Sequence, residues 1–162
     1  MASTWIRGLV MSLGLFIHPI TASPLIDRAP TPFQIDGFAA SGYPYKTASG
    51  YLFWVEHNIT LRPGEGHSWC YAWQRTGTTD MSIQTINTTP CEAEPSVTWS
   101  FAKASGGYNF SLAWRYTGHG QLAGSAWIPD YEIQWITENN NAVQKYVGPS
   151  SFSVATQDLF IG

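Results

Sequence analysis

The chain has 162 residues, of which 44% are hydrophobic, 15% aromatic and only 12% charged, with a formal net charge of −3. This balance is the opposite of the one that keeps a chain disordered, and the length suits one domain with a core of useful size. No cluster of lysine and arginine is present, so the sequence excludes nucleic acid as a partner.

The N-terminus has the pattern of a secretory signal. Arg7 provides the basic start, residues 8–17 form an apolar run, and residues 21–23 are small enough for cleavage. The apolar run is too short to cross a bilayer as a helix, and the other interpretation is a buried N-terminal helix. We expect a secreted, extracellular protein without a membrane span. The predicted parts are a signal peptide at 1–22, a flexible proline-rich leader at 23–32 and a single β domain at 33–162.

Two segments in the first part of the domain are predicted to be strands. Residues 33–38 are a short one, and residues 39–50, rich in Ser, Gly, Tyr and Pro, predict a loop. Residues 51–61 alternate between an apolar and a polar face, which is typical of a half-buried strand. His57 lies on the apolar face, and we therefore expect it in the core. Glu56 lies on the polar face.

The segment 68–75 (SWCYAWQR) predicts a strand whose orientation the alternation leaves open. Either its three aromatic residues face the core, or Cys70 does and the aromatic residues form an exposed ladder. In the second case the rings could stack on a sugar or on a flat aromatic ligand. The candidate ligand-binding residues are Trp69, Tyr71, Trp73 and Arg75.

Cys70 and Cys91 are the two cysteines of the chain. An even number of cysteines in a secreted protein predicts a disulfide. Closing a loop of roughly 20 residues contributes about 3 kcal/mol to stability, largely through the unfolded state. The alternative, a zinc or redox pair, lacks the Cys-x-x-Cys spacing.

The most regular strand pattern lies in the second half of the chain. Residues 97–101 and 108–116 alternate around the turn at 105–107, which predicts a hairpin with its aromatic side chains in the core. A strand at 81–86 and a loop at 87–95 precede it. Further strands are predicted at 122–128, 131–136, 143–147 and 152–155. No convincing amphipathic helix is present, so we predict an all-β fold of about eight to ten short strands, an antiparallel β-sandwich or a closed β-barrel.

Three Asn-x-Ser/Thr sequons predict a glycoprotein: Asn58, Asn87 and Asn109. Asn58 and Asn109 fall on faces that the alternation already marks as polar. Pro90 follows the Asn87 sequon directly and makes it the weakest of the three. A glycan on Asn58 would crowd Trp54 on the same face, and this favours the strand at 68–75 as the binding surface.

Catalysis has one candidate pair, Glu56 and Glu132, each on the polar face of a predicted strand. Two such acids across a groove could act as the acid and the nucleophile or base of a glycoside hydrolase. Residues 131–135 are faintly similar to the nucleophile strand of family-12 endoglucanases, but no second matching acid strand is visible. The other interpretation is two solvated acids, which is the more common situation of surface carboxylates.

Metal and cofactor chemistry has less support. His57, His67 and His119 are scattered and lack the helical spacing of a metal site. The glycines of 118–124 suit a hairpin turn better than a phosphate loop, and no G-x-S-x-G motif is present. We expect no metal and no cofactor, and a chain that binds rather than catalyses.

Several features combine into a resemblance. They are the signal pattern, the strand at 33–38, the spacing of Cys70 and Cys91, the Gly106-Gly107-Tyr108 turn and the closing Tyr146-Val147-Gly148-Pro149-x-x-Phe152. Together, over roughly residues 33–154, they resemble small secreted β-proteins of filamentous fungi, in particular the family of the major Alternaria allergen.

The resemblance implies a β-barrel or sandwich, secretion, no catalysis, and an effector-like or allergen-like role in host contact or small-ligand binding. The partner would then be an extracellular host protein, a polysaccharide or a small aromatic ligand. This chain departs from the family in having only two cysteines, which leaves none for a disulfide-linked dimer. A small glycoside hydrolase or carbohydrate-binding module is the alternative function.

Overall fold

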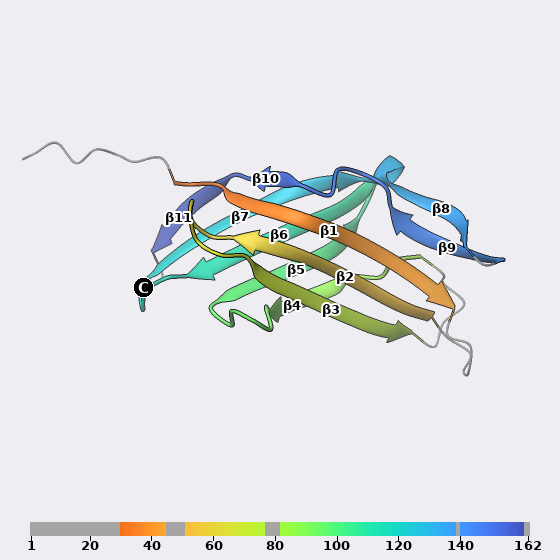
Figure 1. Ribbon diagram of the computed structural model, residues 1–162, viewed down its shortest axis with the longest axis horizontal. Helices are drawn as coiled ribbons and strands as arrows, with labels where there is room; N and C mark the ends of the chain where they lie inside the picture. Colours follow the sequence, from red (N-terminus) through yellow and green to blue (C-terminus); the bar gives the residue numbers. More distant parts are fainter. Residues whose placement is uncertain (1–29, 45–50, 77–81, 139, 161–162) are drawn as a thin grey trace, which may run out of the picture.

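The computed structural model describes residues 30–44, 51–76, 82–138 and 140–160, and this part of the chain is almost entirely β-structure (Figure 1). The strands are β1 (Phe33–Pro44), β2 (Tyr51–Thr60), β3 (Ser68–Thr76), β4 (Ile86–Pro90), β5 (Val97–Ala104), β6 (Gly107–Arg115), β7 (Gly120–Pro129), β8 (Ile133–Glu138), β9 (Asn141–Tyr146), β10 (Phe152–Val154) and β11 (Thr156–Phe160). One short 3-10 helix, η1 (Asp130–Glu132), separates β7 from β8. Within these residues no helix is long and apolar enough to span a membrane. The predicted signal peptide lies outside them.

The strands form two antiparallel sheets that pack face to face. Sheet 1 has the order β3-β2-β1-β9-β8, with β10 also paired to β1, and sheet 2 has the order β11-β7-β6-β5-β4. Figure 1 shows both sheets running along the long axis of the molecule. Because each sheet keeps its own edge strands, the fold is a β-sandwich and not a closed barrel. This decides between the two predicted architectures.

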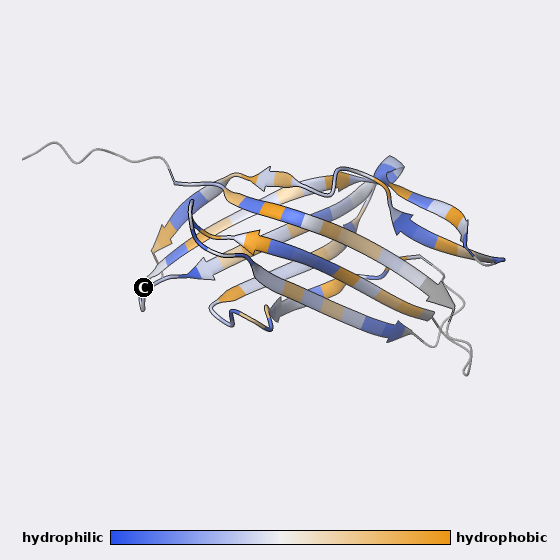
Figure 2. Cartoon of the chain, in the orientation of Figure 1, coloured by the Kyte–Doolittle hydropathy of each residue, from blue (hydrophilic) through white to orange (hydrophobic). Residues whose placement is uncertain are grey.

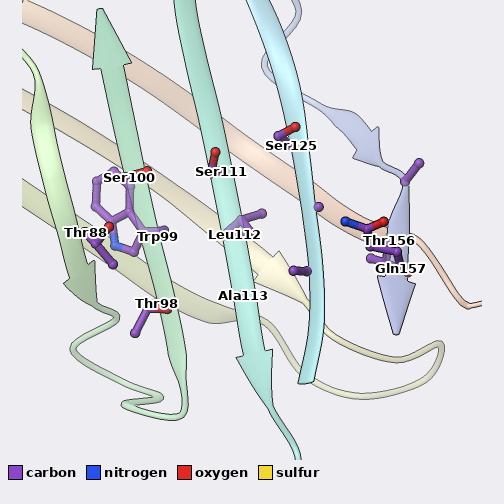
Figure 3. A pocket seen from close by; sticks show the side chains of 13 residues that line it. Thr88, Thr98, Trp99, Ser100, Ser111, Leu112, Ala113, Ser125, Thr156 and Gln157 are labelled. Atoms are coloured by element: carbon purple, nitrogen blue, oxygen red, sulfur yellow. The ribbon is translucent and has the colours of Figure 1, made fainter. Parts of the chain in front are cut away.

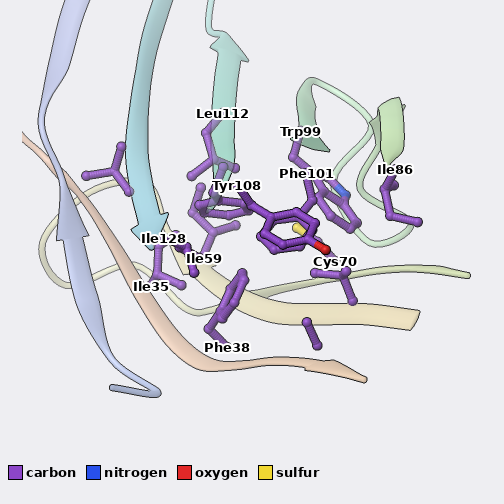
Figure 4. Packing of buried hydrophobic residues seen from close by; sticks show 14 of the residues in the cluster. Ile35, Phe38, Ile59, Cys70, Ile86, Trp99, Phe101, Tyr108, Leu112 and Ile128 are labelled. Atoms are coloured by element: carbon purple, nitrogen blue, oxygen red, sulfur yellow. The ribbon is translucent and has the colours of Figure 1, made fainter. Parts of the chain in front are cut away.

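The hairpin of β5 and β6 supplies much of the core, as the alternation predicts. Trp99 and Phe101 of β5 are buried, and the ring of Phe101 stacks on that of Tyr108 at 4.5 Å between centroids (Figure 4). The Tyr108 hydroxyl donates a 2.7 Å hydrogen bond to the carbonyl of Ile83. Tyr116, expected in the core, is only half-buried because it follows the end of β6.

The predicted turn between β5 and β6 is present. Gly106 in this turn has φ 86°, a left-handed conformation that a glycine accepts without strain.

The hydropathy of the strands also follows the predicted alternation. Hydrophilic and hydrophobic bands alternate along most strands in Figure 2. The period-two pattern in the sequence therefore reports which face of each sheet meets the other sheet.

The first strand is longer than predicted. β1 continues through the expected loop as far as Pro44, and its pairing with β2 shifts at a bulge between Asp36 and Ala39. Gly37 within the bulge has φ 63°. Further along, a side chain at Gly42 would collide with the ring of Phe53, so the missing Cβ allows the two strands to pair closely.

Three other boundaries differ from the prediction. β4 occupies Ile86–Pro90 and thus lies mostly inside the loop predicted at 87–95. Of the strand predicted at 81–86, Ile86 is in a strand, residues 82–85 are not, and Met81 lies outside the described residues. Asp130–Glu132 forms η1, so β8 begins only at Ile133. β11, which pairs with β7, was not predicted at all.

The predicted disulfide is present and joins the two sheets. Cys70 lies in β3, at an edge of sheet 1, and Cys91 directly follows β4, at an edge of sheet 2. Their Cα atoms are 4.5 Å apart, and both residues are buried. The backbone N–H of Cys91 donates to the carbonyl of Val97 at 2.9 Å, which anchors the loop to β5.

Candidate functional site

The orientation of β3 exposes its aromatic residues. Cys70 is buried and Ala72 packs against the core, so the alternate positions face away from sheet 2. We call Trp69, Tyr71 and Trp73 the aromatic ladder. Trp69 keeps 41% and Trp73 58% of its surface exposed. The structure thereby selects the exposed orientation of the two that the sequence left open.

The ladder has matching neighbours on β2. Trp69 lies opposite Asn58, Tyr71 opposite Glu56, and Trp73 opposite Trp54. Side chains directly opposite each other on one face of an antiparallel pair lie within contact distance. Arg75 follows Trp73 on the same face and is exposed. The surface thus combines large rings with a carboxylate at its middle and a guanidinium at its end.

The two ends of the ladder differ. The rings of Trp69 and Tyr71 stack on each other, with centroids 5.3 Å apart and planes 11° from parallel. One face of each ring is therefore already covered. Trp73 is the most exposed member, and the only charged residue among its near neighbours along β3 is Arg75. The Trp73 end is the open end of the ladder.

A glycan at the Asn58 sequon would restrict access to the Trp69 end of the aromatic ladder. Asn58 is the cross-strand partner of Trp69, so a glycan there would stand beside Trp69, whereas Trp54, the neighbour expected from the sequence, is four residues away along β2 and lies opposite Trp73. Trp73 is four residues further along β3, roughly 13 Å away at the rise of an extended strand. The other two sequon asparagines, Asn87 and Asn109, are both exposed, and neither lies in β2 or β3.

The structure does not bring the two candidate acids together. Glu56 alternates with buried residues of β2 and lies on the outer face of sheet 1, whereas Glu132 borders a cavity that Trp127 and Phe152 also line. Strands β1 and β9 separate β2 from β8, which starts directly after Glu132. Three strand spacings of about 4.8 Å amount to roughly 14 Å. Glycosidase carboxylates lie only about 5–9.5 Å apart.

Glu132 has a structural neighbour instead. Its carboxylate lies beside Tyr146, and burial, followed by the negative charge of Glu132, raises the pKa of the Tyr146 hydroxyl to about 12. That hydroxyl also donates to the carbonyl of Pro149 at 2.9 Å. The backbone carbonyl of Glu132 accepts from the N–H of Val147 at 2.8 Å. These contacts fix the chain around η1.

The three histidines in the described part of the chain do not form a shared site. His67 is exposed, with its Nδ1 2.8 Å from the hydroxyl of Thr60 and 3.9 Å from the carboxylate of Asp36. His119 is exposed in the turn between β6 and β7. His57 is completely buried, as its place on the apolar face predicts.

His57 has a neighbour that the sequence did not reveal. It lies directly opposite Cys70 in the pairing of β2 with β3. A ring nitrogen of His57 and the sulfurs of Cys70 and Cys91 all lie within 4.8 Å of one another. The only signal in the sequence is that His57 and Cys70 both fall on core-facing positions, and the strand register that joins them is not readable from periodicity.

A shallow groove of about 570 Å³ crosses the outer face of sheet 2 (Figure 3). Ser100, Ser111 and Ser125 form a row across β5, β6 and β7, and none of its 13 lining residues is charged. Trp99 borders the groove only with its backbone, because its ring is buried. The groove offers hydroxyls but no aromatic face and no acid or base.

The structure also exposes aromatic residues that sequence reasoning missed. Trp127 near the end of β7, Tyr131 in η1 and Trp135 in β8 are all exposed. A second cavity, of about 520 Å³, contains Trp114 and Arg62, whose guanidinium lies 4.7 Å from the centroid of the indole. The tryptophans among these residues can serve as controls when ligand binding at the ladder is tested.

Fold and surface together define a disulfide-containing antiparallel β-sandwich with an exposed aromatic edge strand. Its fold is similar to that in the crystal structure of the Alternaria alternata allergen Alt a 1, with a TM-score of 0.50. The identity is 12%, and the match covers 85% of this chain and 96% of that chain. The expected resemblance is thus confirmed for the fold, and at this identity for the fold alone. No family model and no curated protein matches the sequence.

Proposed function

We propose that the chain is a secreted, non-enzymatic binding protein that contacts a ring-bearing ligand through the Trp73 end of the aromatic ladder. The observation that carries the proposal is the exposure of Trp73, a large apolar side chain of which 58% remains open to solvent. Exposed aromatic side chains grouped on one surface are typical of interaction sites. The ligand class is a cell-wall polysaccharide or a flat aromatic molecule.

The chemistry of the ladder supports this ligand class. Indole and phenol rings offer apolar faces that stack on sugar rings and on other aromatic rings, and each ring carries a polar group at its edge. The guanidinium of Arg75, on the same face, can donate to hydroxyls or carboxylates of the ligand.

Secretion is the second part of the proposal. A buried disulfide that joins the two sheets is compatible with an extracellular protein, because such bonds persist in oxidising compartments. The signal pattern at 1–22 lies outside the described residues and supports the proposal from the sequence alone.

The test compares two exposed tryptophans of similar accessibility, Trp73 (58%) and Trp135 (51%). Binding of Trp73→Ala and Trp135→Ala to soluble wall polysaccharides and to a flavonoid is measured by calorimetry, together with thermal melting. Trp73→Ala should weaken binding by about 1–2 kcal/mol without lowering the melting temperature. Unchanged binding in Trp73→Ala contradicts the proposal, as does polysaccharide cleavage that disappears in Glu132→Gln.

A further inference from the structure

The core contains a polar side chain that packing alone does not account for. His57 has no exposed surface, and neither of its ring nitrogens has a hydrogen-bond partner among the described residues. Buried polar groups are nearly always hydrogen-bonded, so two unpartnered nitrogens on one ring are unusual. The surroundings are aromatic: Trp99 and Phe110 meet the imidazole edge-on at 4.8 and 4.9 Å between centroids.

The same ring lies against the disulfide. One nitrogen of His57 and the sulfurs of Cys70 and Cys91 are within 4.8 Å of one another, and all three residues are buried. In a tetrahedral zinc site, Zn–S bonds of about 2.3 Å and Zn–N bonds of about 2.0–2.1 Å place the donor atoms roughly 3.5–3.8 Å apart. Breaking the bond between the sulfurs frees both cysteine side chains, and the zinc geometry then requires the three donor atoms, now within 4.8 Å of one another, to adjust by roughly 1–2 Å.

We propose that reduction of the Cys70–Cys91 disulfide turns this cluster into a binding site for Zn²⁺, with two thiolates and the neutral imidazole of His57 as ligands. Two thiolates and one divalent cation sum to zero charge, which an apolar core tolerates. A monovalent soft cation would leave a buried negative charge, and Mg²⁺ or Ca²⁺ requires oxygen ligands.

The protonation states and the coordination number agree with this assignment. Burial lowers the pKa of His57 to about 3, so the imidazole is neutral and able to coordinate over the whole physiological range. Two cysteines and one histidine are the protein ligands of the catalytic zinc in alcohol dehydrogenase, where a water or substrate takes the fourth position. Trp99 Nε1, another buried donor without a partner among the described residues, belongs to the same aromatic cluster and could hydrogen-bond to such a water.

The chemical step balances with a dithiol as reductant. The dithiol supplies two electrons and two protons, the S–S bond breaks, and each cysteine sulfur becomes a thiol while the dithiol becomes a disulfide. Zn²⁺ then displaces the two thiol protons and bonds to both sulfurs and to the imidazole nitrogen. The oxidised chain offers only the imidazole and does not hold the metal.

The experiment uses the chain after removal of its signal, with Co²⁺ as a spectroscopic probe for Zn²⁺. The protein is reduced with a phosphine, which adds no competing thiol, and titrated with Co²⁺ under inert gas. The reduced protein should develop a sulfur-to-cobalt charge-transfer band and the visible bands of tetrahedral Co²⁺, and Zn²⁺ should abolish both. The oxidised protein should show neither band. Absence of these bands in the reduced protein overturns the proposal.

The His57→Phe variant distinguishes metal binding by three ligands from binding by the two thiolates alone. The matched control is His67→Phe, a substitution of an exposed histidine. The reduced His57→Phe variant should bind Co²⁺ more weakly by roughly tenfold or more, and His67→Phe should be unchanged. Equal affinity in the wild type and His57→Phe overturns the role of the imidazole.

Thermal melting keeps the test decisive if the reduced chain or the variant unfolds. Zn²⁺ should raise the melting temperature of the reduced wild type, or restore its near-ultraviolet circular dichroism if the reduced chain is unfolded. It should not change the oxidised protein. A reduced wild-type chain that Zn²⁺ neither stabilises nor refolds contradicts the proposal.

Discussion

At the scale of single residues, His57 makes the fold sensitive to acid. Its imidazole is enclosed by Phe38, Trp99, Phe110 and the disulfide, and none of these carries a charge. Burial without a charged partner lowers the pKa of His57 from 6.5 to about 3. Above pH 6.5 the ring is neutral in both the folded and the unfolded chain. Protonation of His57 then does not change the free energy of unfolding.

The first prediction concerns this pH dependence. Between pH 6.5 and about 3 the unfolded chain binds a proton at His57 that the folded chain does not, so the free energy of unfolding falls as the pH drops. From pH 7 to pH 4 this residue should remove about 3 kcal/mol. Urea unfolding at the two pH values should show a smaller loss in His57→Phe than in the wild type. Equal losses would mean that His57 does not remain neutral in the folded state.

The second prediction concerns the tryptophans of the central hairpin. Trp99→Ala should destabilise the fold by about 3–5 kcal/mol, because the ring is completely enclosed and its removal leaves a cavity. Trp114→Ala should cost less, since Trp114 borders a cavity open to solvent beneath Arg62. Chemical denaturation measures both. A larger loss for Trp114→Ala would contradict this assignment of the two side chains.

At the scale of elements, the predictability of a strand depends on the contrast between its two faces. β2 and the β5–β6 hairpin have one apolar and one polar face, and their faces are readable from the sequence. β3 carries large apolar residues on one face and a cysteine on the other, so its orientation depends on the pairing of His57 with Cys70. The second half of β1 is built of small residues such as Ala39, Ala40 and Gly42 and gives no periodic signal.

Edge strands are harder to predict for a different reason. Among the strands of the described residues, β11 pairs with β7 alone, and nearly all of its residues are exposed, so it lacks an alternating apolar face. The candidate site shows the same limit. The aromatic residues of the ladder could be proposed as a binding surface from the sequence of β3. The cluster of His57 with the two cysteines arises from strand register, which composition and period do not encode.

The third prediction concerns the glycan expected at Asn58. Because Asn58 lies opposite Trp69, a sugar there should shield that end of the ladder. Protein from a glycosylating host should bind a polysaccharide less tightly than its Asn58→Gln variant. Asn109→Gln, which removes a sequon on β6 in the other sheet, is the control and should leave binding unchanged. Weaker binding in Asn58→Gln would show that the polysaccharide contacts Asn58 or its glycan directly.

At the scale of the whole molecule, the disulfide joins the two sheets at the edge formed by β3 and β4. The chain between Cys70 and Cys91 runs from sheet 1 into sheet 2, with a sequence separation of 21. The choice between a sandwich and a barrel was not predictable, because both architectures use the same alternation of inward and outward residues. Closure depends on pairing between edge strands, which no local pattern reports.

The fourth prediction follows from this connection. The double variant Cys70→Ala with Cys91→Ala should lose about 3 kcal/mol of unfolding free energy, mainly because its unfolded chain has more freedom. Metal-free urea titration of the variant against the oxidised wild type measures the difference. No loss would indicate that the two edges stay together through packing alone.

The central claim, that the molecule binds a ring-bearing ligand at the Trp73 end of the ladder, is tested most directly by nuclear magnetic resonance of the tryptophan indole N–H groups. Each indole gives its own signal, so a titration with a wall oligosaccharide or a flavonoid reports the site without mutation. Our account predicts a saturable shift of the Trp73 signal and little change for buried Trp99 or for Trp135 on β8. Shifts confined to Trp114, in the cavity beneath Arg62, or to Trp135 would contradict it.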